Sequence, residues 1–273
     1  MNSEEAILYS KTRKLQHTSF DLYVRRYLSI NPQDVILDVG CGTGDIANEM
    51  AVTARSVTGH DISREMVDVA KQKYQRLNLT YEIADIVDCL QTCPNWKGAF
   101  SKVVSVHVLH WVKERKQAFQ NIFDCLNENG KCYLLFCGPL HQMLGLSKED
   151  LPYYLENHNK WKQHLRGYDH KMYNQLTLEE NMELLKSVGF QKVEGELHSP
   201  CDEIDFGKKQ LSDYLSTLVG HVNYVPEEYR SEILQDATDW CYRNLPVNKR
   251  GNTYTKIDII VLRAMKTEKN VIM

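Results

Sequence analysis

The sequence predicts an α/β fold in which helices cover both faces of a mostly parallel sheet. Residues 35–37 form an apolar, β-rich run without alternation, which is typical of a strand buried on both faces. Similar runs alternate with helix-like segments as far as about residue 137. A turn with three glycines joins the first run to a helix, and glycines allow a sharp turn and close approach of a ligand to the main chain. The pattern therefore indicates a sheet of strand–helix units with a ligand site at its first turn.

The first turn carries an acid and then three glycines: Asp38, followed by Gly40, Gly42 and Gly44 in the spacing G-x-G-x-G. A nicotinamide site would favour G-x-G-x-x-G, with the pyrophosphate at the helix N-terminus. A carboxylate at the strand end repels pyrophosphate but suits a cationic ammonium or sulfonium group. The turn therefore favours S-adenosylmethionine as the cofactor.

Further elements are expected in a regular order up to residue 137. Ser63 predicts a helix N-cap, and Asn129 with Gly130 predicts a turn before the fifth strand. The expected elements are a helix at 45–54, a strand at 56–59, a helix from 63 to 76, a strand at 80–84, a strand at 103–112 that continues into a loop, a helix at 114–126 and a strand at 131–137.

Polar residues follow the carboxyl ends of the expected strands, which lie together at one side of a parallel sheet. Asp61 closes the second strand about 20 residues beyond the glycines, where an acid can accept hydrogen bonds from both ribose hydroxyls. It could instead cap a helix. His107, His110 and Trp111 follow the fourth strand, and ligands of open α/β sheets bind beyond the carboxyl ends of the strands. These three residues are therefore expected at the reaction site.

The remaining segments are expected to surround this core within a single domain, 1–273. A helix over 7–27, within an N-terminal segment 1–28 placed over the active site, carries Leu8, Leu15 and Leu22 at sevenfold spacing. Two blocks, 139–176 and 207–246, predict a helical cap over the carboxyl end of the sheet, although ordinary peripheral packing is an alternative. Between the blocks we expect a helix at 177–187 and a strand ending near 198. The cofactor-binding core is 35–138, and 253–265 is the expected last strand.

Composition points to small-molecule chemistry. The chain has 273 residues, a net charge of -3 and no basic run, which argues against a nucleic-acid partner. It contains neither a secretory leader nor an apolar run long enough to span a bilayer, so a cytoplasmic protein is expected. Eight cysteines include no C-x-x-C pair, and we expect no metal site.

The chain resembles class I methyltransferases in its glycine turn and in the acids at its strand ends. It also resembles the arthropod juvenile hormone acid O-methyltransferases in residues 8–16, LYSKTRKLQ, and 109–112, LHWV. This likeness covers nearly the whole chain. It implies a seven-stranded Rossmann-like sheet with a cap, and S-adenosylmethionine as the cofactor. The cofactor-binding residues that it implies, beyond the glycines, Asp38 and Asp61, are Ile62, Asp85, Ile86 and His107, with Asp85 accepting from the adenine amino group.

The resemblance further implies that Gln16 and Trp111 bind a substrate carboxylate, with His110 as a third donor or simply a structural histidine. From periodicity alone, Gln16 would face solvent. A carboxylic acid is already ionised at neutral pH, so its methylation needs orientation and exclusion of water rather than a general base. The expected substrate is a hydrophobic acid of the farnesoic or juvenile hormone acid type.

Three alternatives remain open from the sequence. A hydroxyl substrate could use His107 or His110 as a general base. The acid could be polar, such as aconitate. The protein could also bind cofactor and ligand without catalysis. The sequence is compatible with a monomer or a homodimer.

Overall fold

The computed structural model describes residues 18–138, 151–168, 176–198, 204–255 and 258–267. The chain divides into two compact units. Unit 1 comprises Met1–Phe136, Leu176–Leu197 and Ile260–Met273, and unit 2 comprises Cys137–Gln175 and His198–Ile259. Nearly all residues of the two predicted cap segments belong to unit 2, and their placement over a site stays a prediction.

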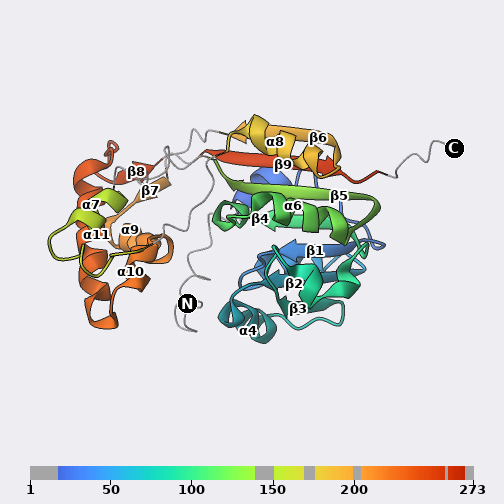
Figure 1. Ribbon diagram of the computed structural model, residues 1–273, viewed down its shortest axis with the longest axis horizontal. Coiled ribbons are helices and arrows are strands. Elements are labelled where there is room, and N and C mark those ends of the chain that lie inside the picture. Colours follow the sequence, from blue (N-terminus) through green and yellow to red (C-terminus); the bar gives the residue numbers. More distant parts are fainter. Residues whose placement is uncertain (1–17, 139–150, 169–175, 199–203, 256–257, 268–273) are drawn as a thin grey trace. The chain divides into compact units, whose positions relative to one another are not determined.

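Unit 1 is built on a seven-stranded sheet with the strand order β3-β2-β1-β4-β5-β9-β6 (Figure 1). The first strand of the chain therefore lies in the middle of its parallel part. The strands are β1 (Val35–Val39), β2 (Ser56–Asp61), β3 (Leu79–Ile83), β4 (Phe100–Val106), β5 (Leu126–Cys137), β6 (Gln191–His198) and β9 (Ile259–Met265).

The pairing of these strands is mostly parallel. β1 pairs in parallel with β2 and β4, β2 with β3, and β4 with β5. The Lys266 N–H donates to the Gly130 carbonyl at 2.9 Å, and the Gly138 N–H donates to the Asp258 carbonyl at 2.7 Å. These bonds join opposite ends of β5 and β9, so β9 runs antiparallel to β5. The predicted seven-stranded, mostly parallel sheet is confirmed.

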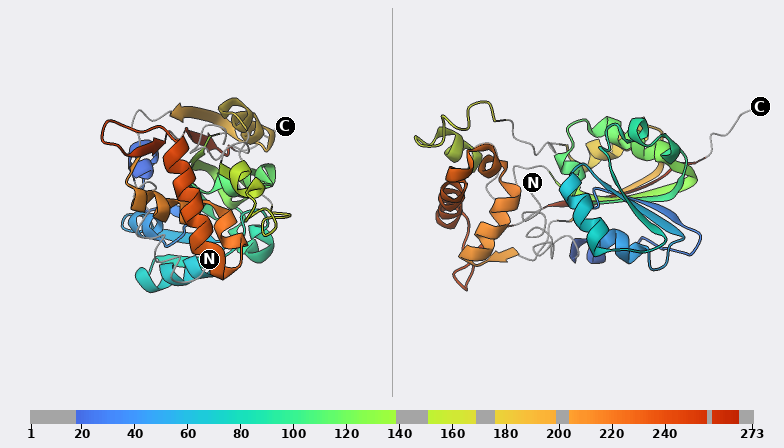
Figure 2. Two further views of the ribbon diagram at one scale, coloured as in Figure 1. Left: turned by 90° about the vertical axis from the view of Figure 1, so that its left-hand side faces the viewer. Right: turned by 90° about the horizontal axis from the view of Figure 1, so that it is seen from below.

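Helices lie on both faces of the sheet (Figure 2). The spacing of the apolar residues along each helix decides which of its sides is buried. On α6, buried apolar residues recur at 118, 119, 122 and 125, which form one face of the helix. The Ser63 hydroxyl accepts from the Met66 N–H at 3.3 Å at the start of α4, as predicted. The helices of unit 1 are α3 (Asp45–Met50), α4 (Arg64–Lys73), α5 (Cys89–Thr92), α6 (Arg115–Cys125) and α8 (Leu178–Ser187), with shorter turns at Phe20–Val24, Pro94–Trp96 and Leu109–Trp111.

The predicted N-terminal helix differs from the structure in its buried face. Most of it lies outside the described residues, and its described part ends in a π-helical turn, Phe20–Val24. Phe20 and Val24 are buried, whereas Leu22 is 52% exposed, so the sevenfold stripe is wrong at Leu22. The Arg25 N–H donates to the Phe20 carbonyl, five residues back, at 2.8 Å. This wider turn changes the face that each residue presents.

The expected last strand, 253–265, is two strands rather than one. β8 (Thr253–Thr255) pairs antiparallel with β7 (Ile204–Phe206) in a separate sheet, and only β9 joins the seven-stranded sheet. The continuous apolar run that a strand buried on both faces needs begins at Ile259, which explains where β9 starts.

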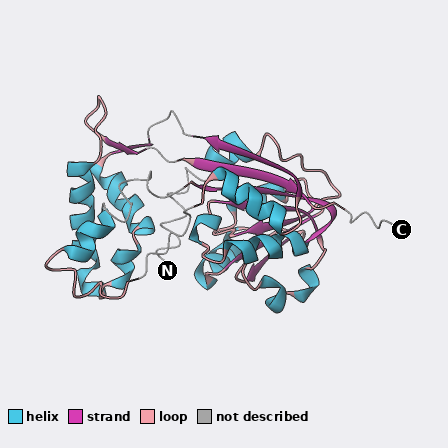
Figure 3. Cartoon of the chain, turned by 45° about the horizontal axis from the view of Figure 1, so that its top comes forward, coloured by secondary structure: helices cyan, strands magenta, loops and turns pink. Residues whose placement is uncertain are grey.

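Unit 2 is mainly helical (Figure 3). On α9, Leu211 and Leu215 are buried, and on α11 the buried positions are 233, 237, 238 and 241, so spacing of three and four residues gives each helix an apolar face. The Trp161 indole N–H donates to Asp236 of α11 at 2.8 Å. None of the described helices is long and apolar enough to cross a membrane. The elements are α7 (Leu151–Asn157), α9 (Lys208–Leu218), α10 (Gly220–Tyr224), the turn Glu227–Tyr229 and α11 (Arg230–Asn244), with β7 and β8.

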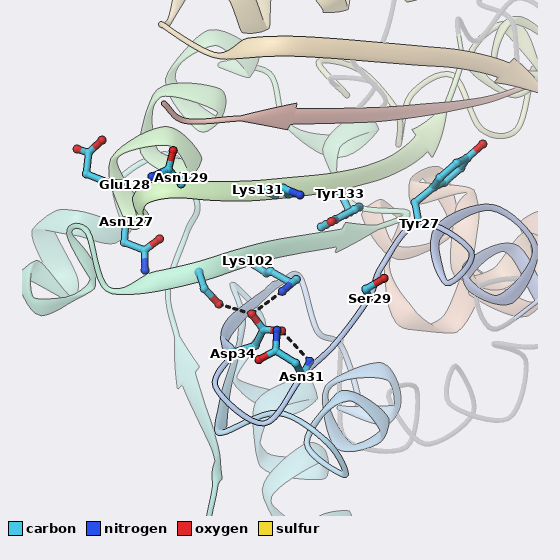
Figure 4. A pocket seen from close by; sticks show the side chains of 11 residues that line it. Tyr27, Ser29, Asn31, Asp34, Lys102, Asn127, Glu128, Asn129, Lys131 and Tyr133 are labelled. Carbon is cyan, nitrogen blue, oxygen red and sulfur yellow. Dashed lines mark hydrogen bonds and ion pairs between the residues drawn. The ribbon is translucent and has the colours of Figure 1, made fainter. Parts of the chain in front are cut away.

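A buried ion pair joins the amino ends of β1 and β4 in unit 1 (Figure 4). Asp34 is 4% exposed and pairs with Lys102, and its carboxylate also accepts from the Ser101 hydroxyl at 2.9 Å and the Asn31 N–H at 2.8 Å. Burial by itself raises the pKa of Asp34, but the hydrogen bonds from Lys102, Asn31 and Ser101 outweigh it and leave the pKa below 3.8. These residues line a polar pocket of about 450 Å³ at the amino ends of the strands.

Replacing Lys102 by Met should lower the free energy of unfolding by about 3–5 kcal/mol, because it leaves the Asp34 carboxylate buried without its cation. The double variant Lys102→Met/Asp34→Leu should recover part of this loss. Urea denaturation at pH 7 measures both. Because the folded-state pKa of Asp34 is lowered, its contribution is complete above the unfolded value and is lost as the pH falls below about 3.9. A single variant as stable as the parent would contradict this account.

Candidate functional site

The candidate cofactor residues lie at the carboxyl ends of four neighbouring strands in unit 1. Asp38 is on β1, and its pairing partners are Gly59 on β2 and Val104 on β4. Asp61 ends β2, Asp85 follows β3, and His107 follows β4. The strand order β3-β2-β1-β4 therefore places all four loops along one edge of the sheet. Residues 1–17 lie outside the described part of the chain, and so does Gln16.

The glycine turn has a left-handed backbone at each of its glycines. The φ angles are 70° at Gly40, 54° at Gly42 and 81° at Gly44, a region that side chains with a Cβ rarely adopt. A Cβ at Gly40 would lie 2.2 Å from a Val108 methyl carbon, and one at Gly44 would lie 2.4 Å from the Tyr81 hydroxyl. At these two positions the protein's own side chains, rather than a ligand, occupy the space beside the glycine. The glycines thus allow the loop after β4 and strand β3 to pack against the turn.

Asp61 ties the loop after β2 to the glycine turn. One carboxylate oxygen accepts from the Gly42 N–H at 3.0 Å, and the other accepts from the Ser63 N–H at 2.9 Å. A carboxylate has about four acceptor positions, so two remain for hydroxyl donors. Ile62 follows directly and is 69% exposed. The acid is therefore fixed in orientation, and an apolar surface lies next to it.

Helix α6 holds the loop after β3 through hydrogen bonds from one of its side chains. The half-buried Asp85 accepts from the Val87 N–H at 3.0 Å. The Asn121 amide of α6 donates to the carbonyls of Ile86 and Val87, each at 2.7 Å. Ile86 is 4% exposed and its side chain belongs to the hydrophobic core. This packing helps to anchor the loop that carries Asp85, and contact of Ile86 with the cofactor stays a prediction.

Three aromatic or imidazole side chains gather in the loop after β4. His107 has a φ of 58°, and its main-chain N–H donates to the Leu135 carbonyl of β5 at 2.7 Å. The ring of His110 lies 6.2 Å from that of His107 and 5.0 Å from that of Trp111. Trp111 is half-buried, and among the described residues no acceptor meets its indole N–H. The loop thus combines buried imidazoles with an indole donor that is available to a ligand.

His110 is 3% exposed and stays neutral near pH 7. Burial, together with the neighbouring His107 and the Arg115 guanidinium, lowers the pKa of His110 well below 6.5. A neutral imidazole has one N–H donor and one acceptor nitrogen. His110 can therefore donate a hydrogen bond without adding positive charge to the site.

Sequence reasoning missed Tyr81, Asn121 and His60 as parts of this region. Tyr81 is buried on β3, and its hydroxyl donates to the Gly44 carbonyl at 3.2 Å. Asn121 interrupts the apolar face of α6, and His60 precedes Asp61 within a buried strand. A polar residue within an otherwise apolar pattern was the signal available for the last two.

We expect Gly40→Ala to lose far more stability than Gly98→Ala. The two glycines have similar φ angles, 70° and 67°, but only Gly40 has a neighbour where the new Cβ would lie. Gly98→Ala should cost about 1–2 kcal/mol, the penalty for a left-handed residue with a Cβ, and Gly40→Ala should cost more because Val108 must move. Urea denaturation compares the two variants. Equal losses would mean that the contact with Val108 is unimportant.

Comparisons with known proteins agree with this architecture. A family model described as a methyltransferase domain matches residues 36–130. The chain is 26% identical over 252 residues to the juvenile hormone acid O-methyltransferase of Drosophila melanogaster, which covers 86% of this chain and 82% of that protein. It is also 26% identical over 216 residues to the enzyme of the same name from Bombyx mori, with 76% and 73% covered.

A solved structure shares the fold at low sequence identity. Phosphoethanolamine N-methyltransferase 2 of Haemonchus contortus, in complex with S-adenosyl-L-methionine, superposes with a TM-score of 0.62 at 17% identity. The match covers 98% of this chain and 58% of that chain. Residues 36–130 therefore match the model of a methyltransferase domain, the chain has the fold of class I S-adenosylmethionine-dependent methyltransferases, and it resembles the juvenile hormone acid O-methyltransferases.

Proposed function

We propose that this protein transfers a methyl group from S-adenosylmethionine to the carboxylate of a hydrophobic acid, of the farnesoic or juvenile hormone acid type. The likeness to two juvenile hormone acid O-methyltransferases over most of the chain supports the substrate class. The observation that carries the proposal is Trp111, a half-buried indole donor without a partner among the described residues, in the loop that packs on the glycine turn.

The cofactor site follows from the strand-end loops. Asp61 would accept from the ribose hydroxyls with its remaining acceptor positions, and Asp85 from the adenine amino group. The exposed Ile62 would cover one side of the adenine. Asp38 is the acid on the central strand and would attract the cationic end of the cofactor. When bound, S-adenosylmethionine supplies a methyl group on a positively charged sulfur.

The acceptor side needs orientation more than proton transfer. A carboxylate is ionised at neutral pH, so Trp111 and Gln16 would hold it as neutral donors without a tight ion pair that would weaken the nucleophile. His110 would supply a further neutral donor, and the pKa of His110, which burial lowers well below 6.5, keeps it uncharged.

Replacing Trp111 by Phe keeps an aromatic ring and removes the indole donor. We expect kcat/KM for the acid to fall by roughly ten- to a hundredfold, which corresponds to about 1.5–3 kcal/mol for a hydrogen bond to a charged group. Affinity for S-adenosylhomocysteine, measured by calorimetry, should stay within about twofold because the proposed partner of the donor is the acid and not the cofactor.

Tyr133→Phe is the matched control, since it also removes a donor and keeps the ring. Tyr133 lines the polar pocket at the amino ends of the strands (Figure 4) and should leave kcat/KM unchanged. Gln16→Leu tests the second proposed donor in the same assay. Unaltered kinetics in both Trp111→Phe and Gln16→Leu would remove the basis for a carboxylate clamp.

A substrate panel assayed with labelled S-adenosylmethionine tests the acceptor class. It contains free acids of increasing chain length, aconitate, and hydroxyl compounds of matched carbon skeleton. Long acids should exceed short ones by orders of magnitude in kcat/KM, since each buried methylene contributes about 0.8 kcal/mol. For these acids kcat should be flat from pH 6.5 to 8, because neither the carboxylate nor His110 changes protonation there.

The outcomes of the panel separate the alternatives. Turnover of a hydroxyl compound in preference to the acids, at a rate that rises with pH, would favour a base-assisted methyltransferase. Preference for aconitate would favour a polar acid. Binding of S-adenosylhomocysteine without turnover of any compound would favour a non-catalytic binding protein.

A further inference from the structure

His60 occupies the position before Asp61 on β2 and is buried, with 2% of its surface exposed. Its ring Nδ1 lies 3.1 Å from the Ala84 carbonyl oxygen. A carbonyl can only accept, so Nδ1 carries the proton and donates. The His60 carbonyl in turn accepts from the Cys41 N–H at 2.9 Å.

These bonds connect His60 to two neighbouring loops of the candidate cofactor site. Cys41 belongs to the glycine turn, and Ala84 directly precedes Asp85. The next residue, Asp61, accepts from the Gly42 N–H at 3.0 Å, while its carbonyl accepts from the Ala84 N–H at 3.1 Å. The imidazole therefore adds a side-chain link between β2 and the loop after β3, beside the main-chain link at the same place.

In the part of the chain that the structure describes, the Ala84 carbonyl is the only hydrogen-bond partner of the His60 ring. Trp96 packs on it with ring centroids 5.3 Å apart, and Trp96 is itself 5% exposed. The second ring nitrogen, Nε2, is buried without a hydrogen-bond partner among the described residues. A leucine would fill a similar space without burying an unpaired nitrogen. What the imidazole adds is thus the bond from Nδ1 to Ala84.

We propose that His60 is a positioning residue of the cofactor site, which sets the distance between Asp61 and Asp85 by holding the Ala84 carbonyl. The two carboxylates must meet the ribose and the adenine of one rigid adenosine, so a shift of the loop after β3 would misplace one of them. This inference rests on the cofactor roles proposed above for Asp61 and Asp85, and it extends them to a residue that does not itself touch the cofactor.

A pair of variants separates positioning from space filling. Asn has a side-chain N–H₂ close to the place of the imidazole Nδ1, whereas Leu has no donor. His60→Leu should weaken S-adenosylhomocysteine binding by about tenfold, the effect of about one hydrogen bond, and raise the KM for S-adenosylmethionine with little change in kcat. His60→Asn should restore affinity to within about threefold of the parent. His60→Gln, whose amide reaches instead towards the Nε2 position, should behave like His60→Leu and serves if the Leu variant does not fold.

Asn78→Leu is the control for a general loss of stability. The Asn78 amide donates to the carbonyls of Ala51 and Ala54 at 2.9 and 3.0 Å, at the amino ends of β2 and β3. This variant also loses part-buried hydrogen bonds from a side chain to the main chain, but it should bind S-adenosylhomocysteine as the parent does. Calorimetry measures the affinities, and urea denaturation measures the stabilities.

Each outcome has a defined meaning. If His60→Leu and His60→Gln bind as tightly as the parent, or if His60→Asn is as impaired as they are, the positioning role is excluded while the proposed function stands. A parent protein that does not bind S-adenosylhomocysteine would overturn the proposed function, and this inference with it. Rescue by Asn alone supports the proposal.

Discussion

The parallel pairing of β1 with β2 on one side and β4 on the other is the constraint on which the candidate site depends. Parallel strands end at the same edge, so the loops that leave them must satisfy one another's main-chain groups. The Cys41 N–H is satisfied by the His60 carbonyl, the Ala84 N–H by the Asp61 carbonyl, and the His107 N–H by the Leu135 carbonyl. The loops are therefore ordered by their neighbours, and their acids are held before any ligand arrives.

Close packing around the glycine turn adds a second level of order. Val108 and Tyr81 approach Gly40 and Gly44 so closely that no Cβ would fit. The same valine belongs to the loop that carries Trp111, and the main-chain N–H of Trp111 donates to the Val108 carbonyl at 2.9 Å. The contact between Val108 and Gly40 thus connects the proposed cofactor turn to the loop that carries the proposed acceptor-binding donor. A substitution that moves one of these loops is expected to shift the other.

Much of the fold could be predicted because its signals are local. The unalternating run at 35–37 and the Ser63 cap can be recognised within a few residues, and the structure confirms them. Leu22 was misjudged because a π-helical turn replaces regular helical spacing there. The contribution of Asn121 was not predictable from its own helix, because its amide bonds to carbonyls that lie 34 and 35 residues earlier in the chain.

By itself, the sequence determined the α/β class, the acid and glycines of the first turn, and the acids after β2 and β3, since each depends on residue type and short spacing. Only the tertiary structure decided what those residues contact. It gave Asp61 the N–H groups of Gly42 and Ser63, put Val108 against Gly40, and separated β8 from β9. The physical reason is that strand register and side-chain packing join segments far apart in the chain, and no local pattern specifies which buried polar groups will meet.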